Sequence, residues 1–136
     1  MGLDTTHEAW HGPYGVFNRW RDQLARTAGY ELAELEGNYG RETILIDWGH
    51  IVPKNYEGEW DETPADPLIM LIAHSDCDGV IHPEHAGPLA DRLEELLPML
   101  PEGDGGGHIG SWRDKTRTFI DGLRAALAAD EDVEFY

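Results

Sequence analysis

Apolar residues recur at helical spacing in three stretches of the sequence, and this periodicity constrains the fold more than any other feature. The stretches cover residues 16–28, 88–97 and 112–127. Side chains that return every three or four positions lie on one face of a helix, so each stretch should pack one face into a core. The expected inward-facing residues are Val16, Phe17, Trp20, Leu24 and Ala28 in the first stretch, Leu89, Leu93, Leu96 and Leu97 in the second, and Trp112, Thr116, Phe119, Leu123 and Leu127 in the third.

Residues that favour helix ends flank these stretches. Gly29 suits the left-handed position that follows the first helix. Ser111 suits the N-cap of the last helix, with Asp114 three residues further on. Asp66 and the proline after it predict a further short helix, which would run to about His74.

Two segments favour strands instead. Residues 42–48 are rich in β-favouring side chains and lie between glycine-bearing turns. In the tail, Val133 and Phe135 alternate with acids, which is typical of a short strand, and this strand could pair with residues 42–48. The length of 136 residues and the lack of an internal repeat indicate a single domain spanning residues 1–136. We therefore predict an α+β fold, mainly helical, with a small β-sheet.

The chain is strongly acidic, with 27 Asp and Glu against 10 Lys and Arg and a formal net charge of -17 at pH 7. Such a surface repels nucleic acid, because phosphate binding needs clustered Lys and Arg. The acidity either maintains solubility or forms a face that docks on a basic protein. The expected partner is therefore a small molecule or a basic protein, with no direct binding of nucleic acid.

The sequence predicts neither a signal peptide nor a membrane-spanning segment, and the match of MGLDTT to the N-myristoylation pattern is short enough to be a chance match. The longest apolar run, residues 68–73, is far too short to cross a bilayer. The first residues have neither the basic start nor the apolar stretch of a signal peptide, and the single cysteine, Cys77, cannot form an internal disulfide. A soluble, cytoplasmic protein is expected.

The segment HSDCDGVIHPEH, residues 74–85, concentrates residues that bind metals. As a calcium loop turning at Gly79 it places Asp76 and Asp78 at ligand positions, but it has histidines where the first and last ligands must be oxygen-bearing acids. A divalent metal such as zinc would have four ligands at knuckle-like spacing, namely His74, Cys77, His82 and His85. In a purely structural interpretation, Asp76 and Asp78 cap backbone amides, Gly79 is left-handed and the histidines have no ligand.

Two further motifs match known site patterns imperfectly. HEAWH, residues 7–11, has the zinc-protease spacing, but Gly12 and Pro13 would end its helix at once, so we expect a chance match. The stretch GGGHIGSWRDKTR, residues 105–117, places glycines before a helix N-terminus, where backbone amides can hold an anion. It lacks the phosphate-loop pattern, and a flexible connector is the simpler interpretation.

Aromatic rings are concentrated near the N-terminus. Trp10, His11, Tyr14, Phe17 and Trp20 place large rings within a few helical turns. Most of them should belong to the core. Rings that face a cleft would instead stack on a flat ligand such as a nucleobase, with Arg19 or Arg21 available for its phosphate.

Several of these segments together carry a resemblance. They are MGLD and AWHGPYGVFNRWR near the start, HSDCDGVI and GPLADRLEELLP in the middle, and GGGHIGSWRDKTRTFIDGLRAA towards the end. In this combination the chain resembles a group of small acidic proteins of actinobacteria and their bacteriophages that carry the HSDCDG motif. The group lacks a glutamate at the position of Glu8 and a histidine at that of His85, which weakens the protease and zinc interpretations. The resemblance implies an origin but no activity.

Three hypotheses follow, and each names its own residues. The first is a non-enzymatic binding protein that sequesters a small nucleotide-like ligand in a cleft formed by His11, Trp20, Asp76 and Asp78. The second is an acidic interaction module that inhibits a host defence protein or a nucleic-acid-binding protein. The third is a metal-dependent hydrolase that uses the HSDCDG loop, with His74, Asp76, Asp78 and His82 as its residues.

Overall fold

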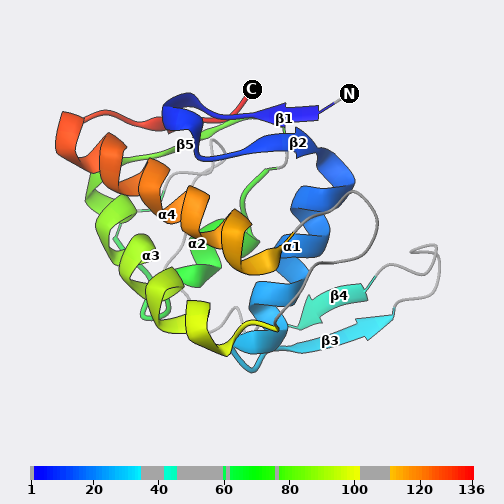
Figure 1. Ribbon diagram of the computed structural model, residues 1–136. Coiled ribbons are helices and arrows are strands. Elements are labelled where there is room, and N and C mark those ends of the chain that lie inside the picture. Colours follow the sequence, from blue (N-terminus) through cyan, green and yellow to red (C-terminus); the bar gives the residue numbers. More distant parts are fainter. Residues whose placement is uncertain (1, 35–41, 46–59, 61, 76, 102–110) are drawn as a thin grey trace.

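The computed structural model describes residues 2–34, 42–45, 60, 62–75, 77–101 and 111–136. The described residues form four α-helices: α1 (Tyr14–Thr27), α2 (Leu68–Ile72), α3 (Pro83–Leu96) and α4 (Trp112–Ala129). The same part of the chain contains the short 3-10 helices η1 (Thr6–Glu8) and η3 (Leu97–Met99). Figure 1 shows α3 and α4 side by side, with α1 on the opposite side of α2. The predicted mainly helical α+β fold is confirmed.

Among the described residues, six short strands form three antiparallel pairs. β1 (Gly2–Asp4) pairs with β2 (His11–Pro13), with Leu3 opposite Gly12. β3 (Glu31–Glu34) pairs with β4 (Glu42–Leu45), and β5 (Val80–Ile81) pairs with β6 (Val133–Glu134). The prediction that the C-terminal strand pairs with residues 42–48 is therefore wrong. Residues 31–34 are much nearer in sequence to β4, so their pairing closes a shorter loop at a lower entropic cost. Residues 46–48 of the predicted strand lie outside the described residues.

The C-terminal strand lies between β5 and the N-terminal strand (Figure 1). Asp4 and Tyr136 exchange two backbone hydrogen bonds of 2.9 Å each, and Thr5 forms a bridge with Phe135. On the other side, the N–H of Phe135 donates to the carbonyl of Gly79 at 2.9 Å. The C-terminal segment thus lies between the N-terminal strand and the segment that follows the HSDCDG motif.

Ser111 and Gly29 lie at helix ends as predicted, but α2 begins at Leu68 with Pro67 as its N-cap and ends at Ile72, before His74. Ser111 Oγ accepts the N–H of Asp114 at 3.3 Å, and Asp66 Oδ1 accepts the N–H of Leu68 at 3.0 Å. Gly29 has a φ of +93°, as expected of a residue that ends a helix. α3, however, begins at Pro83 and not at Pro88. At the first position of a helix the backbone N–H has no partner within the helix, so a proline, which lacks this N–H, is favourable there. Pro83 occupies this position.

The core is formed by the inward faces of the four helices and by the N-terminal rings. Phe17, Trp20 and Phe119 are fully buried, and Trp20 lies against Trp10 and Phe119 with ring centroids 5.0 Å away in each case. Leu127, predicted to face inward, is instead 42% exposed. The buried face of α4 continues from Leu123 to Ala126, and Leu127 lies about 100° further round the helix. None of the described helices combines the length and apolar character needed to cross a membrane.

Candidate functional site

The central loop joins α2 to β5 and contains the HSDCDG motif. Its first residues are held by Arg21 of α1, whose guanidinium donates to the carbonyls of Leu71 at 3.2 Å, Ile72 at 3.3 Å and His74. The same guanidinium lies 4.5 Å from the centroid of the Phe17 ring. A cation at the C-terminal carbonyls of a helix is favourable, so Arg21 is a structural cap and not an exposed phosphate ligand.

A serine organises the turn of this loop. Ser75 Oγ accepts the backbone N–H groups of Cys77 at 3.2 Å and of Asp78 at 3.3 Å. Gly79 has a φ of +94°, which confirms its predicted left-handed conformation. The side chain of Asp78 is exposed, and Asp76 lies outside the described residues. The turn is thus capped by Ser75, a residue that the sequence interpretation did not single out.

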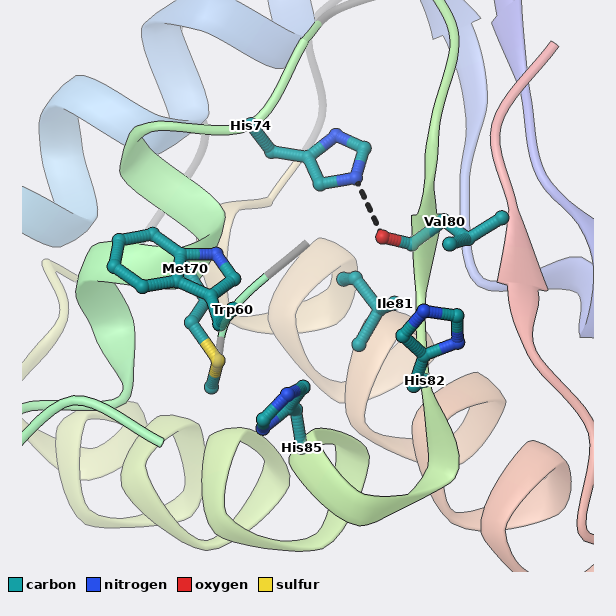
Figure 2. Close-up of a pocket in the computed structure, with 7 residues that line it drawn as sticks. All are labelled: Trp60, Met70, His74, Val80, Ile81, His82 and His85. Carbon is teal, nitrogen blue, oxygen red and sulfur yellow. Dashed lines mark hydrogen bonds between the residues drawn. The ribbon is translucent and has the colours of Figure 1, made fainter. Parts of the chain in front are cut away.

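Three histidines line one small cavity beside this loop (Figure 2). We call it the histidine-lined cavity. Its volume is about 10 Å³, which is room for one water-sized sphere. The residues around it are Trp60, Met70, His74, Val80, Ile81, His82 and His85. Three of the four predicted zinc ligands therefore lie on a common cavity.

Two of these histidines use ring nitrogens in contacts with oxygen atoms. The Nδ1 and Nε2 atoms of His74 lie 2.8 Å from the carbonyl oxygen of Ser75 and 3.1 Å from that of Val80. His82 Nδ1 lies 2.7 Å from Asp132 Oδ1, in the segment just before β6. These contacts hold the loop to β5 and to the C-terminal strand.

His85 differs from the other two. It is 4% exposed and its Nδ1 lies 2.9 Å from Thr63 Oγ1. Its Nε2 is buried and has no hydrogen-bond partner. The exposed carboxylate of Glu84 lies 3.8 Å from Nε2, beyond hydrogen-bond distance. A buried polar atom without a partner is uncommon in folded proteins and marks this atom for explanation.

The fourth predicted zinc ligand lies elsewhere. Cys77 is exposed, and its Sγ lies 3.4 Å from Ser75 Oγ and does not line the cavity. Within the part of the chain that the structure describes, no three His, Cys, Asp or Glu side chains form a group that could hold a metal ion. The four side chains predicted to bind zinc are thus only partly brought together.

A larger groove lies between the N-terminal segment and the start of α4. We call it the α4 groove. It has a volume of about 380 Å³ and is lined by Glu8, Ala9, Trp10, His11, Ser111, Asp114, Lys115 and Thr118. The groove brings together two segments that the sequence singled out, HEAWH and the end of the glycine-rich stretch. Its volume falls within the range of small-molecule sites.

The polar groups of the α4 groove are mixed in charge. Lys115 Nζ lies 5.2 Å from the centroid of the Trp10 ring, while Glu8 and Asp114 are exposed acids. Trp10 is 4% exposed, and its indole N–H has no hydrogen-bond partner. The ring of His11 is exposed and contacts Asp4 through Nδ1. The groove therefore offers both donors and acceptors to a polar ligand.

The residues of the predicted ligand cleft are dispersed. His11 lines the α4 groove, whereas Asp78 lies on the surface of the central loop. Trp20 is fully buried, and its indole N–H donates to Thr116 Oγ1 at 2.9 Å. The expectation that Trp20 faces a cleft is wrong, because the ring is fully buried against Trp10, Phe17 and Phe119. The fourth residue, Asp76, is outside the described part of the chain.

HEAWH does not form the helical turn that a zinc protease requires. His7 lies in η1 with a φ of 59°, and His11 begins β2. The Nε2 atom of His7 lies 3.3 Å from Glu131 Oε1, whereas His11 contacts Asp4. The two histidines thus point to different partners, which agrees with a chance match.

Sequence reasoning did not single out Met70 as a wall of the histidine-lined cavity, whereas Lys115 of the α4 groove belongs to the stretch GGGHIGSWRDKTR, which was considered as an anion site. Trp60 follows a polar segment but is itself 9% exposed, and Met70 is 2% exposed. Met70 belongs to the apolar run at 68–73, which signals burial without indicating a site.

No family model, no curated protein and no solved structure matches the chain.

Proposed function

We propose that this chain is a non-enzymatic cytoplasmic binding protein and that its small-molecule site is the α4 groove. The observation that carries this proposal is the groove itself, because it is large enough for a small ligand and is lined by Trp10, His11 and Lys115. The leading hypothesis from the sequence is thereby retained for His11 but not for Trp20.

The chemistry of the groove favours a nucleotide-like ligand with both donor and acceptor groups. Lys115 and the N-terminal end of α4 suit a phosphate or another anionic group. The exposed ring of His11 offers a flat surface, and Glu8 can accept hydrogen bonds from an amine. The acids also limit the total negative charge that such a ligand can carry.

Titration with AMP tests this proposal. We expect backbone amide signals in the NMR spectrum to shift for residues 8–11 and 111–118, with smaller shifts for adenosine. Lys115→Met should weaken AMP binding at least about tenfold, because it removes a hydrogen bond to a charged group. Arg117→Met is the matched control, since Arg117 is exposed on the same helix and does not line the groove. Shifts that scatter over the surface, or equal effects of the two variants, would reject the site.

A second candidate function is an acidic interaction module, as in a phage-type inhibitor of a host protein. It is favoured by the contacts of three arginines, which bind acids and backbone carbonyls of the chain itself. Arg92 binds Asp66 and Glu95, Arg113 donates to the carbonyls of Leu100 and Pro98, and Arg124 binds Asp91 and Glu94. Although burial lowers the pKa of Arg92, its bonds to Asp66 and Glu95 raise it more. These cations serve the chain's own groups, so many exposed acids remain for a partner.

This candidate predicts a complex that depends on ionic strength. The immobilised chain should retain a basic protein from host extract at about 50 mM salt and release it at about 500 mM, because screening at the higher concentration acts within a few ångströms. A complex that persists unchanged at high salt, or the absence of any complex at low salt, would argue against an electrostatic module. Neither result would affect the AMP experiment.

A further inference from the structure

The histidine-lined cavity presents two soft donor groups, the imidazole of His85 and the thioether of Met70. Figure 2 shows the ring of His85 and the sulfur of Met70 facing the space between Trp60 and Ile81. Met70 is 2% exposed, and His85 Nε2 has no hydrogen-bond partner. Both groups are therefore held out of water around a space of about 10 Å³.

The contact with Thr63 prepares His85 to act as a ligand. When Nδ1 donates its hydrogen to Thr63 Oγ1, 2.9 Å away, Nε2 carries the lone pair. Metal-bound histidines are held in this way, with the second ring nitrogen donating to a fixed acceptor. In this tautomer the ring presents the lone pair of Nε2 as a donor for a metal ion.

The cavity has the size of one water molecule, but its walls offer few groups that could form hydrogen bonds with water. Buried water normally makes two to four hydrogen bonds. The ring nitrogens of His74 face the carbonyls of Ser75 and Val80, and His82 Nδ1 contacts Asp132. Trp60, Met70 and Ile81 supply mostly apolar surface. An occupant that bonds to nitrogen and sulfur would be better satisfied there than water.

The donor set selects a soft ion of low charge. Zinc sites use four donors and commonly thiolates, whereas the described walls of this cavity contain neither a thiolate nor a carboxylate. Thioether and imidazole donors suit copper(I), and an aromatic wall such as Trp60 attracts a cation. We propose that the histidine-lined cavity binds one soft monovalent metal ion, copper(I) or its redox-inert analogue silver(I), through His85 Nε2 and Met70 Sδ. This proposal does not rest on the ligand proposed for the α4 groove.

Silver(I) titration of the full chain tests the proposal. The Cys77→Ser variant serves as the reference, because the exposed thiol would itself bind silver. With ¹³C-labelled methionine methyl groups, the signal of Met70 should shift at one equivalent of silver(I). The signal of Met99, which is 62% exposed, should remain in place until silver is in excess.

Two variants in the same background assign the ligands. Met70→Leu and His85→Gln should each lower the affinity for silver(I) at least about tenfold, because loss of even an outer partner of a ligand can cost about 10- to 100-fold. Met99→Leu is the matched control and should bind as the reference does. If His85→Gln fails to fold, the nearly isosteric Met70→Leu and the methyl spectrum still decide.

Three outcomes would overturn the proposal. A response of Met99 at or before that of Met70 would mean adventitious binding on the surface. An unchanged Met70 signal would mean that the cavity holds water or nothing. A shift of Met70 on titration with zinc(II) but not with silver(I) would restore the zinc interpretation.

Discussion

Replacing Trp20 with alanine is expected to lower the free energy of unfolding by about 3–5 kcal/mol. The indole is fully buried between Trp10 and Phe119, and its N–H bonds to Thr116 at 2.9 Å. Its removal leaves a cavity in the aromatic core and deprives the oxygen of the Thr116 hydroxyl of the indole donor. Chemical denaturation followed by far-UV circular dichroism measures the change.

The matched control for this prediction is an aromatic ring outside the core. Tyr136→Ala removes a ring that is 66% exposed, and it should change stability by less than about 0.5 kcal/mol. If Trp20→Ala instead retained nearly full stability, the ring could not have the packing described above. Its position as a ligand-facing side chain would then have to be reconsidered.

Gly122→Ala should cost at least about 1–3 kcal/mol, the range typical of overpacked cores. A Cβ atom at Gly122 would lie 2.4 Å from Cβ, 2.6 Å from Cα and 3.0 Å from the backbone nitrogen of Ala9. Two of these three atoms are backbone, so the obstacle cannot move aside as a flexible side chain would. Ala9→Gly removes only the Cβ contact and should therefore rescue the variant in part. The same denaturation experiment gives both values.

Gly15 provides the opposite case within a helix. It lies in α1, and a Cβ there would meet no atom within 4 Å. Gly15→Ala should therefore stabilise the protein by about 0.4–1 kcal/mol, because alanine loses less backbone entropy on folding. A gain in stability for Gly122→Ala as well would contradict the close contact between α4 and Ala9.

The helices could be predicted because their signal is local. Periodic apolar residues and capping groups such as Ser111 and Asp66 act within one or two turns, and the structure retains both caps. The partner of the C-terminal strand could not be predicted, since a two-residue strand carries little information on register or neighbour. The pairing of the C-terminal strand with β5, in which Ile81 lies opposite Val133, depends on the fold of the whole chain.

The candidate sites were predictable as a list of residues but not as an arrangement. Three histidines of the HSDCDGVIHPEH segment do reach a common cavity, as their clustering suggested. The ring nitrogens of His74 contact backbone carbonyls. Every residue carries a carbonyl, so a sequence pattern cannot predict such a contact. Trp20 was ambiguous for a similar reason, because a ring on an apolar face suits a core and a cleft equally well until its neighbours are known.

Arg21 gives the two candidate sites a common mechanical support. Its guanidinium binds the carbonyl of His74, a wall of the histidine-lined cavity, and it lies over Phe17 of the same helix. Phe17 in turn packs edge-on against Trp10, a wall of the α4 groove, with ring centroids 5.2 Å apart. Trp10 is thus connected to the central loop through successive contacts with Phe17 and Arg21. A ligand that displaced Trp10 would disturb these contacts. If occupation of one site changed the affinity of the other, the effect would have to be equal in both directions.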